Sequence, residues 1–153
     1  MKHYKDTLNN IYAYESDGSQ DAFIKEGLVP ISDEDLSILR APTAGQLLSQ
    51  LSAARKAQEQ QGVVINGIRY AGDPGNRQAL QEAITYIEDA GLTEFAIWKD
   101  SDDVFHADHP LADVKDAARA IGVRRSQLIA AEGEYAAQIT AGTLTDLSEV
   151  VWP

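Results

Sequence analysis

Apolar and polar residues alternate most regularly between residues 62 and 70, where the sequence reads GVVINGIRY. The dipeptide Asn66-Gly67 lies between two short apolar runs, which is the strongest local signal of a β-hairpin because a type I′ turn needs positive φ at both central residues. A two-residue turn pairs Ile65 with Ile68, and side chains alternate between the two faces of each strand. The pattern therefore predicts a hairpin with one apolar face that another element must cover. That face consists of Val63, Ile65, Ile68 and Tyr70.

Helical patterns, with apolar residues three and four positions apart, stand on both sides of this hairpin. The first helix is expected to be capped by Thr43 and to run to about Gln61, where Gly62 supplies the left-handed residue that ends it. Its apolar stripe is expected to be buried and its opposite side to face water. The stripe consists of Leu47, Leu48, Leu51, Ala54 and Ala57, and the wet side of Arg55, Lys56, Gln58 and Glu59.

The next helix has a clear start, because Asp73 can cap it and Pro74 suits the first helical position. Gly91 is expected to end it. Its buried face consists of Leu80, Ala83, Ile84 and Ile87.

Residues 95–99 and 104–107 predict a second hairpin around the polar turn 100–103, which would place Trp98 opposite Phe105. We expect the two hairpins to lie in one antiparallel sheet with helices packed on one side of it.

A last long helix is expected to open at His109-Pro110, to be capped by Asp108 and to extend to about residue 141, a length of roughly 45 Å if it is unbroken. Gly122 and Gly133 each cost about 1 kcal/mol relative to alanine, which favours a bend or a break. Thr145 can cap a final turn. The apolar stripe of the long helix consists of Val114, Ala118, Ile121, Leu128, Tyr135 and Ile139, and Arg125 and Glu132 interrupt it.

This stripe is longer than two hairpins can cover, because strands of five residues span only about 17–20 Å. We therefore expect Leu128, Tyr135 and Ile139 to be buried by a second copy, giving a homo-oligomer, or by a partner protein, unless the helix over 47–57 reaches them. Arg124 and Arg125 would then flank the contact as salt-bridging residues.

The first 42 residues predict a separate β-rich module. Short strands are expected at 3–5 and 11–14, an extended edge at 28–31, and a short helix that Ser32 caps. Residues 43–153 would form a helix–hairpin–helix–hairpin–helix domain, so the predicted fold class is α+β. Tyr4, Tyr12 and Tyr14 lie on neighbouring strands of the module. Such residues more often pack as core under a neighbouring helix, and an exposed aromatic binding surface is the alternative.

Composition excludes several classes of protein. The 153 residues carry a net charge of −11, which disfavours nucleic acid and anionic membrane surfaces as partners. The absence of cysteine excludes disulfides and is typical of a cytoplasmic protein. No apolar run approaches the length of a membrane span.

No catalytic, metal or cofactor motif emerges from the residues. His106, Asp108 and His109 are possible metal ligands, but their spacing matches no standard site. The aspartates at 100, 102 and 103 lack the glycine and glutamate of a calcium loop. The segment 72–76 lacks the lysine of a phosphate loop. We therefore expect a protein that is not an enzyme and that needs no cofactor.

Longer motifs carry a family resemblance. GVVINGIRYAGDPGNRQALQEAI, then WKDSDDVFHADHPLADVKDAARAI, an alanine-rich helix and a terminal LSEVVW resemble a domain family of uncharacterised function in bacteriophage and prophage tail proteins. The likeness covers about residues 44–152 and includes the Asn-Gly turn, Asp73 with Arg77, and the Trp-Lys hairpin. The opening MKHYKDTLNNIYAYESDGSQDAFIKEGLVPIS is similar to those of tail-fibre assembly and tail-fibre-associated proteins.

The resemblance implies an assembly chaperone that binds a phage tail fibre or another tail protein without catalysis. The alternative is a structural minor tail or baseplate component of the virion, and a small metal-dependent enzyme is the remote one. The protein would act in the host bacterial cytoplasm during assembly or on the virion tail. The candidate contact residues are Leu128, Tyr135, Ile139, Tyr12 and Tyr14.

Overall fold

A computed structural model describes the whole chain, Met1–Pro153, and separates it into two compact units, Met1–Thr43 and Ala44–Pro153. The boundary lies one residue beyond the expected end of the β-rich module.

The first unit is a three-stranded antiparallel sheet followed by a short helix. Strand β1 (Lys2–Lys5) lies between β2 (Ile11–Tyr14) and β3 (Val29–Ile31), and helix α1 (Asp33–Arg40) follows β3. Pro30 is tolerated because β3 is an edge strand. As predicted, Ser32 caps α1, and its Oγ accepts a hydrogen bond from the backbone N–H of Asp35 at 3.0 Å.

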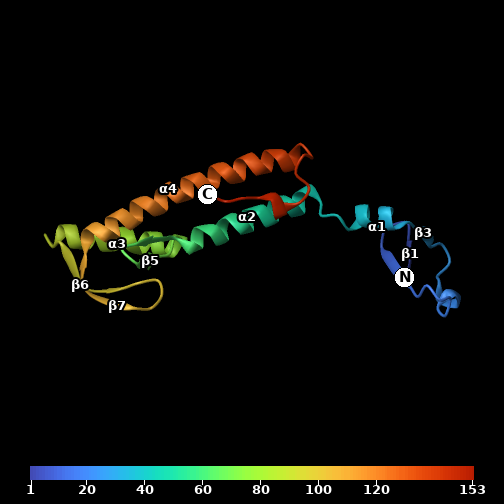
Figure 1. Cartoon of the computed structure of the whole chain (residues 1–153), viewed down its shortest axis with the longest axis horizontal. Coiled ribbons are helices and arrows are strands. Elements are labelled where there is room, and N and C mark those ends of the chain that lie inside the picture. The colour runs from blue at the N-terminus through green and yellow to red at the C-terminus, as the bar shows by residue number, and fades with distance from the viewer. The chain divides into compact units, whose positions relative to one another are not determined.

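The second unit begins with helix α2 (Ala44–Gln61) and the hairpin of β4 (Val63–Ile65) and β5 (Ile68–Tyr70). Helix α3 (Pro74–Asp89), a second hairpin of β6 (Glu94–Lys99) and β7 (Phe105–Pro110), and helix α4 (Leu111–Thr140) follow. Figure 1 shows α2 and α4 side by side and antiparallel, with the C-terminal segment returning along the pair. The α+β fold class is confirmed, and no helix is both long and apolar enough to cross a membrane.

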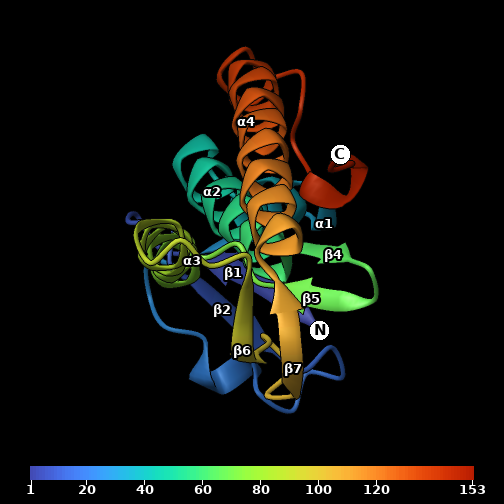
Figure 2. The same ribbon diagram turned by 90° about the vertical axis from the view of Figure 1, so that its left-hand side faces the viewer.

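The first hairpin has the predicted register, with Ile65 opposite Ile68 and Val63 opposite Tyr70. The expectation of one common sheet is wrong, because β4–β5 and β6–β7 form two separate two-stranded sheets. Figure 2 shows the two hairpins as distinct ribbons below α4. They meet through a loop instead. The backbone N–H of Ser101 donates to the carbonyl oxygen of Arg69 at 3.2 Å, and the N–H of Ala71 donates to Ser101 Oγ at 2.8 Å.

Helix α3 starts and ends as predicted, with Asp73 accepting hydrogen bonds from the first-turn N–H groups and Gly91 in the left-handed region beyond its end. Two other caps were predicted wrongly. Helix α4 begins after Pro110, which makes no side-chain cap, and Asp146 rather than Thr145 caps the final turn, Leu147–Glu149.

Helix α4 runs without a break through both of its glycines. Its buried face explains this continuity, because Val114, Ile121 and Leu128 are at most 3% exposed. Burying a large aliphatic side chain stabilises a fold by about 1.5–3 kcal/mol, which exceeds the helix cost of about 1 kcal/mol for one glycine.

Two hydrophobic clusters hold the second unit together. The first joins α3, the hairpins and the N-terminal half of α4, and its buried members are Tyr70, Leu80, Ile84, Ile87, Phe95, Leu111, Val114, Ala117 and Ile121. The second joins α2, the C-terminal end of α4 and the C-terminal tail, and its buried members are Leu47, Leu51, Ile139 and Leu144.

An ionic layer links α2 to α4 on the stretch of helix between these clusters. Glu59 is only 8% exposed, so its assignment to the wet side of α2 is wrong. Its carboxylate pairs with Arg55 and Arg125, and Arg55 Nε also lies 2.6 Å from Glu132 Oε2. The two charged residues that interrupt the stripe of α4 therefore face charged partners on α2, which favours this register of the helix pair over shifted ones.

Candidate functional site

The turn of the β6–β7 hairpin is organised by Asp100. Its Oδ1 accepts hydrogen bonds from the backbone N–H groups of Asp102 at 2.8 Å and Val104 at 2.9 Å, and Asp103 takes a positive φ of 64°. The turn therefore extends to Val104, one residue longer than expected. The predicted pairing of Trp98 with Phe105 is wrong, because Trp98 faces His106 and Lys99 faces Phe105.

Both strands of this hairpin change the face that they bury along their length. Asp108 has a positive φ of 50°, and the pair that it would form with Ala96 is missing from the ladder. Where the pairing of two strands is interrupted, residues three positions apart, rather than two, can lie on the same face of the sheet. Asp108 thus bends the strand instead of capping α4, and its conformation brings four rings together. They are Phe95, Trp98, His106 and His109.

These rings pack against Tyr70 of the first hairpin. The Trp98 ring is stacked on His109 with centroids 5.6 Å apart, and Tyr70 lies 6.0 Å from Trp98. The Tyr70 hydroxyl and His109 Nε2 share a hydrogen bond of 2.6 Å. Burial raises the pKa of Tyr70 to about 12 and lowers the pKa of His109, so the pair is neutral at pH 7.

The second histidine is tied to the turn. His106 Nε2 lies 2.8 Å from Asp100 Oδ2, and this hydrogen bond, with those from the turn backbone, lowers the pKa of Asp100 to about 2. The ring centroids of His106 and His109 are 6.0 Å apart. No three histidine, aspartate or glutamate side chains gather into a group that could hold a metal ion. Both histidines act in the fold as supports of the hairpin.

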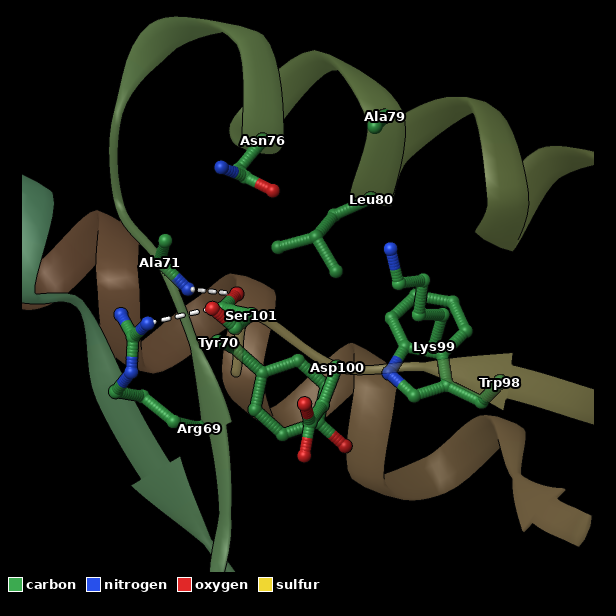
Figure 3. Close-up of a pocket in the computed structure, with 10 residues that line it drawn as sticks. All are labelled: Arg69, Tyr70, Ala71, Asn76, Ala79, Leu80, Trp98, Lys99, Asp100 and Ser101. Atoms are coloured by element: carbon green, nitrogen blue, oxygen red, sulfur yellow. Dashed lines mark hydrogen bonds between the residues drawn. The ribbon is translucent and has the colours of Figure 1, made fainter. Parts of the chain in front are cut away.

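A cavity of about 110 Å³ lies between this hairpin, β5 and the start of α3. Figure 3 shows Leu80 and Asn76 reaching from α3 toward Ser101 and Tyr70 on the opposite side. The buried indole Nε1 of Trp98, which lines the cavity, has no hydrogen-bond partner in the chain. An unpaired buried donor costs about 1–3 kcal/mol.

The outer face of the hairpin carries exposed apolar side chains beside Lys99, whose ammonium lies 5.8 Å from the centroid of the Phe105 ring. Ile97 is 61% and Phe105 66% exposed, and Val104 at the turn is 51% exposed. The ladder places Ile97 opposite Ala107 and Phe105 opposite Lys99, so these side chains share one face. We define Ile97, Val104 and Phe105 as the hairpin patch.

The hairpin patch is a candidate binding surface because its support is rigid. The ring cluster fixes the inner face, and Arg69 Nη2 of the first hairpin donates a 2.6 Å hydrogen bond to the carbonyl oxygen of Ser101 (Figure 3). A preorganised apolar surface loses little conformational freedom on binding.

The α4 residues expected to contact a partner lie elsewhere. Leu128 is fully buried and Ile139 is 3% exposed, so the exception foreseen for them holds and they have a cover within their own chain. Helix α2 and the C-terminal tail cover Tyr135 and Ile139 at the end of the stripe. The Tyr135 hydroxyl donates to the carbonyl oxygen of Val151 at 3.2 Å. A homo-oligomer that uses Leu128 or Ile139 would require the helix pair to open.

The expected rim arginines also bind within the chain. Arg125 Nε lies 3.4 Å from Glu59 Oε1. Arg124 donates to Gln58 Oε1 at 3.2 Å and to the carbonyl oxygen of Pro153 at 3.1 Å.

The tyrosines of the first unit are half-buried on their sheet. Tyr4 lies opposite Tyr12, and the rings of Tyr4 and Tyr14 meet edge to face with centroids 5.6 Å apart. The Tyr12 hydroxyl donates to Asp6 Oδ2 at 3.2 Å. Partner binding by Tyr12 and Tyr14 stays a prediction.

Sequence reasoning overlooked the hairpin patch although a signal was present. Residues 95–99 read FAIWK, in which apolar side chains fall on both faces of a strand. A two-stranded sheet with apolar residues on both faces has more apolar surface than one core can cover.

Comparison with known proteins identifies one family. A family model described as a domain of unknown function (DUF4376) matches residues 42–151, which span nearly all of the second unit. No curated protein and no solved structure matches the chain.

Proposed function

The chain belongs to the DUF4376 family. From this membership, we propose that it is a tail-fibre assembly chaperone. The exposed hairpin patch and the resemblance to phage tail proteins support the proposal. It binds the fibre stoichiometrically and catalyses no reaction. The observation that carries the proposal is the apolar outer face of the β6–β7 hairpin.

The mechanism follows from the chemistry of that face. A newly made fibre exposes apolar surface before its chains assemble, and such surface drives aggregation. The hairpin patch covers part of it, and burial of apolar area supplies the attraction. The net charge of −11 makes complexes repel one another, which limits their association.

The test is co-expression with a phage tail-fibre gene, followed by pull-down through a tag on this chain. The double variant Ile97→Glu/Phe105→Glu changes two exposed strand residues and leaves the buried ring cluster intact. We expect it to lose capture of the fibre and to reduce the yield of soluble fibre.

A matched control changes two exposed apolar residues of α4, Val123→Glu/Ile129→Glu, which are 54% and 41% exposed. This variant adds the same charge and should capture fibre like the parent. Equal capture by the hairpin variant and the parent would refute the proposed surface.

Purified virions separate the chaperone from the alternative of a structural tail or baseplate component. A chaperone that leaves after assembly is missing from virions, whereas a structural component is present at a fixed ratio to the other tail proteins. Presence at a fixed ratio would replace the chaperone proposal by the structural one.

A further inference from the structure

A second cavity, of about 290 Å³, adjoins the ionic layer where the C-terminal half of α2, the start of α3 and the middle of α4 meet. Four of its lining side chains are cationic and only two are carboxylates, although the whole chain carries a net charge of −11. The local excess of positive charge is therefore opposite in sign to the charge of the protein. The charged lining residues are Arg55, Lys56, Arg77, Arg125, Glu59 and Asp73.

One of the two carboxylates, Glu59, is shared by three guanidinium groups. Its Oε1 pairs with Arg55 and lies 3.4 Å from Arg125 Nε, and its Oε2 lies 3.5 Å from Arg77 Nη1. Charge-assisted hydrogen bonds between nitrogen and oxygen are usually about 2.7–2.9 Å long. Arg77 and Arg125 are therefore held loosely by Glu59, while Arg55 is held firmly.

The other carboxylate, Asp73, is committed to the cap of α3. Its Oδ1 accepts from the backbone N–H groups of Gly75 at 3.0 Å and Asn76 at 3.1 Å, and its Oδ2 accepts from the Asn76 side chain. It forms no ion pair with Lys56 or Arg77.

Several donors at the cavity remain without an acceptor in the chain. Arg77 Nη1 donates to the carbonyl oxygen of Gly72 at 2.6 Å, but its Nε and Nη2 make no hydrogen bond within the protein. The side chains of Arg125 and Lys56 likewise make no hydrogen bond within the protein, and the guanidinium of Arg125 has only its long contact with Glu59. The side chains of Arg125 and Arg77 are 44% and 28% exposed, so solvent and solutes reach them.

We propose that this cavity binds a small oxyanion, with a carboxylate or phosphate group held by Arg77, Arg125 and Lys56. The planar guanidinium presents two parallel N–H groups that match two oxygens of such an anion, and the ammonium adds a third contact. The positive end of the α3 dipole at Pro74 adds to the attraction. Binding shifts Arg77 and Arg125 from the shared carboxylate to the ligand, while Arg55 keeps both Glu59 and Glu132.

The test uses the full chain, titrated by isothermal calorimetry with inorganic phosphate and, separately, with citrate as the carboxylate probe. Sodium chloride at matched ionic strength is the reference, because general screening acts equally in all three salts. We expect saturable binding of one anion per chain and a melting temperature that rises with anion concentration. Binding of phosphate alone or of citrate alone shows which of the two groups the site accepts.

Two matched variants decide whether the cavity is the site. Lys56→Gln/Arg125→Gln removes two cations from its lining, and Lys115→Gln/Arg119→Gln removes two cations from the exposed surface of α4. The first should weaken binding by about tenfold or more and the second by less than about twofold, because each lost charge-assisted hydrogen bond is worth a tenfold or greater factor.

Two results would overturn the proposal. One is the absence of saturable binding of both probes beyond the chloride reference. The other is an equal loss in the two variants, which would assign the effect to overall charge. The Lys56/Arg125 variant should still capture fibre, so failure here is distinguishable from failure of the proposed function.

Discussion

The backbone segments at the two ends of the first hairpin approach each other closely, and this approach can be tested quantitatively. Gly62 has a φ of +69°, and a Cβ added there would lie 1.8 Å from the carbonyl oxygen of Tyr70 and 2.7 Å from the Cα of Ala71. A Cβ on Gly72 would lie 2.3 Å from the carbonyl oxygen of Glu59, without a positive φ. Gly67 has a φ of +81° but nothing within 4 Å. The three glycines therefore separate backbone strain from close approach.

Alanine at each position should destabilise the protein to a different degree. At Gly67 only the left-handed conformation is penalised, at about 1–2 kcal/mol. At Gly72 the clash is with backbone, which cannot rotate away, so the cost is about 1–3 kcal/mol, as for an overpacked core. At Gly62 both effects act, and the expected loss is roughly 3 kcal/mol or more. Valine at Gly67 should cost about 1–3 kcal/mol, since a β-branched residue resists positive φ.

The assay is equilibrium unfolding in urea, followed by tryptophan fluorescence and by circular dichroism. The midpoint of unfolding and the dependence of the unfolding free energy on urea concentration are compared among the three alanine variants and the parent. An unchanged dependence shows that the same surface area becomes exposed on unfolding. If Gly62→Ala loses no more stability than Gly67→Ala, the close approach of the two segments at Gly62 is refuted. If Gly67→Ala or Gly67→Val melts with the parent, the type I′ turn is wrong.

Further perturbations address the charges, the titrating groups and the two units. Glu59→Gln leaves the arginines around it without their shared carboxylate and should cost roughly 3 kcal/mol in urea unfolding; a loss below about 0.5 kcal/mol, the size typical of surface substitutions, would contradict the buried layer. The pKa of His109 is lowered in the fold from its ordinary value of 6.5. The free energy of unfolding is therefore highest above that pH and decreases as the pH falls below it. His109→Gln should flatten the dependence of unfolding free energy on pH in that range, and a slope equal to the parent's would exclude this histidine as its cause. Residues 44–153 alone should unfold cooperatively, since both clusters lie within them; a soluble fragment with a gradual transition would show that the first unit completes the core. Leu128→Glu/Ile139→Glu should unfold the helix pair by circular dichroism, and a folded variant that merely changes its sedimentation would restore an oligomer contact on α4.

The turns and helix ends that were predicted correctly depend on neighbours in the sequence. The Asn-Gly turn needs two residues that tolerate positive φ, and it determines the register of β4 and β5 without help from the rest of the chain. The caps at Ser32 and Asp73 are likewise made with N–H groups two or three residues away. Such contacts have the same partners in any tertiary arrangement, so the sequence alone determines them.

The failures share a different cause. Adding one residue to the turn at Val104 reverses which side chains face each other, because side chains alternate along a strand. The residues at which β6 ends and β7 begins depend on Asp100. Its hydrogen bond with His106 forms only when the two strands pair. Asp108 was expected to cap α4 from its residue type, yet the packing of His109 under Tyr70 places it in the strand.

The faces of α2 and α4 show most clearly what only the tertiary structure decided. A helical wheel places Glu59 on the wet side of α2, and it leaves Leu128 and Ile139 of α4 without a known cover. The burial of Glu59 depends on Arg125, which is 66 residues away in the chain, and the burial of Ile139 depends on Leu47 and Leu51 of the opposite helix. The amino-acid pattern determines which residues can be buried, but the partner of each face is chosen by contacts that form only when distant segments pack together.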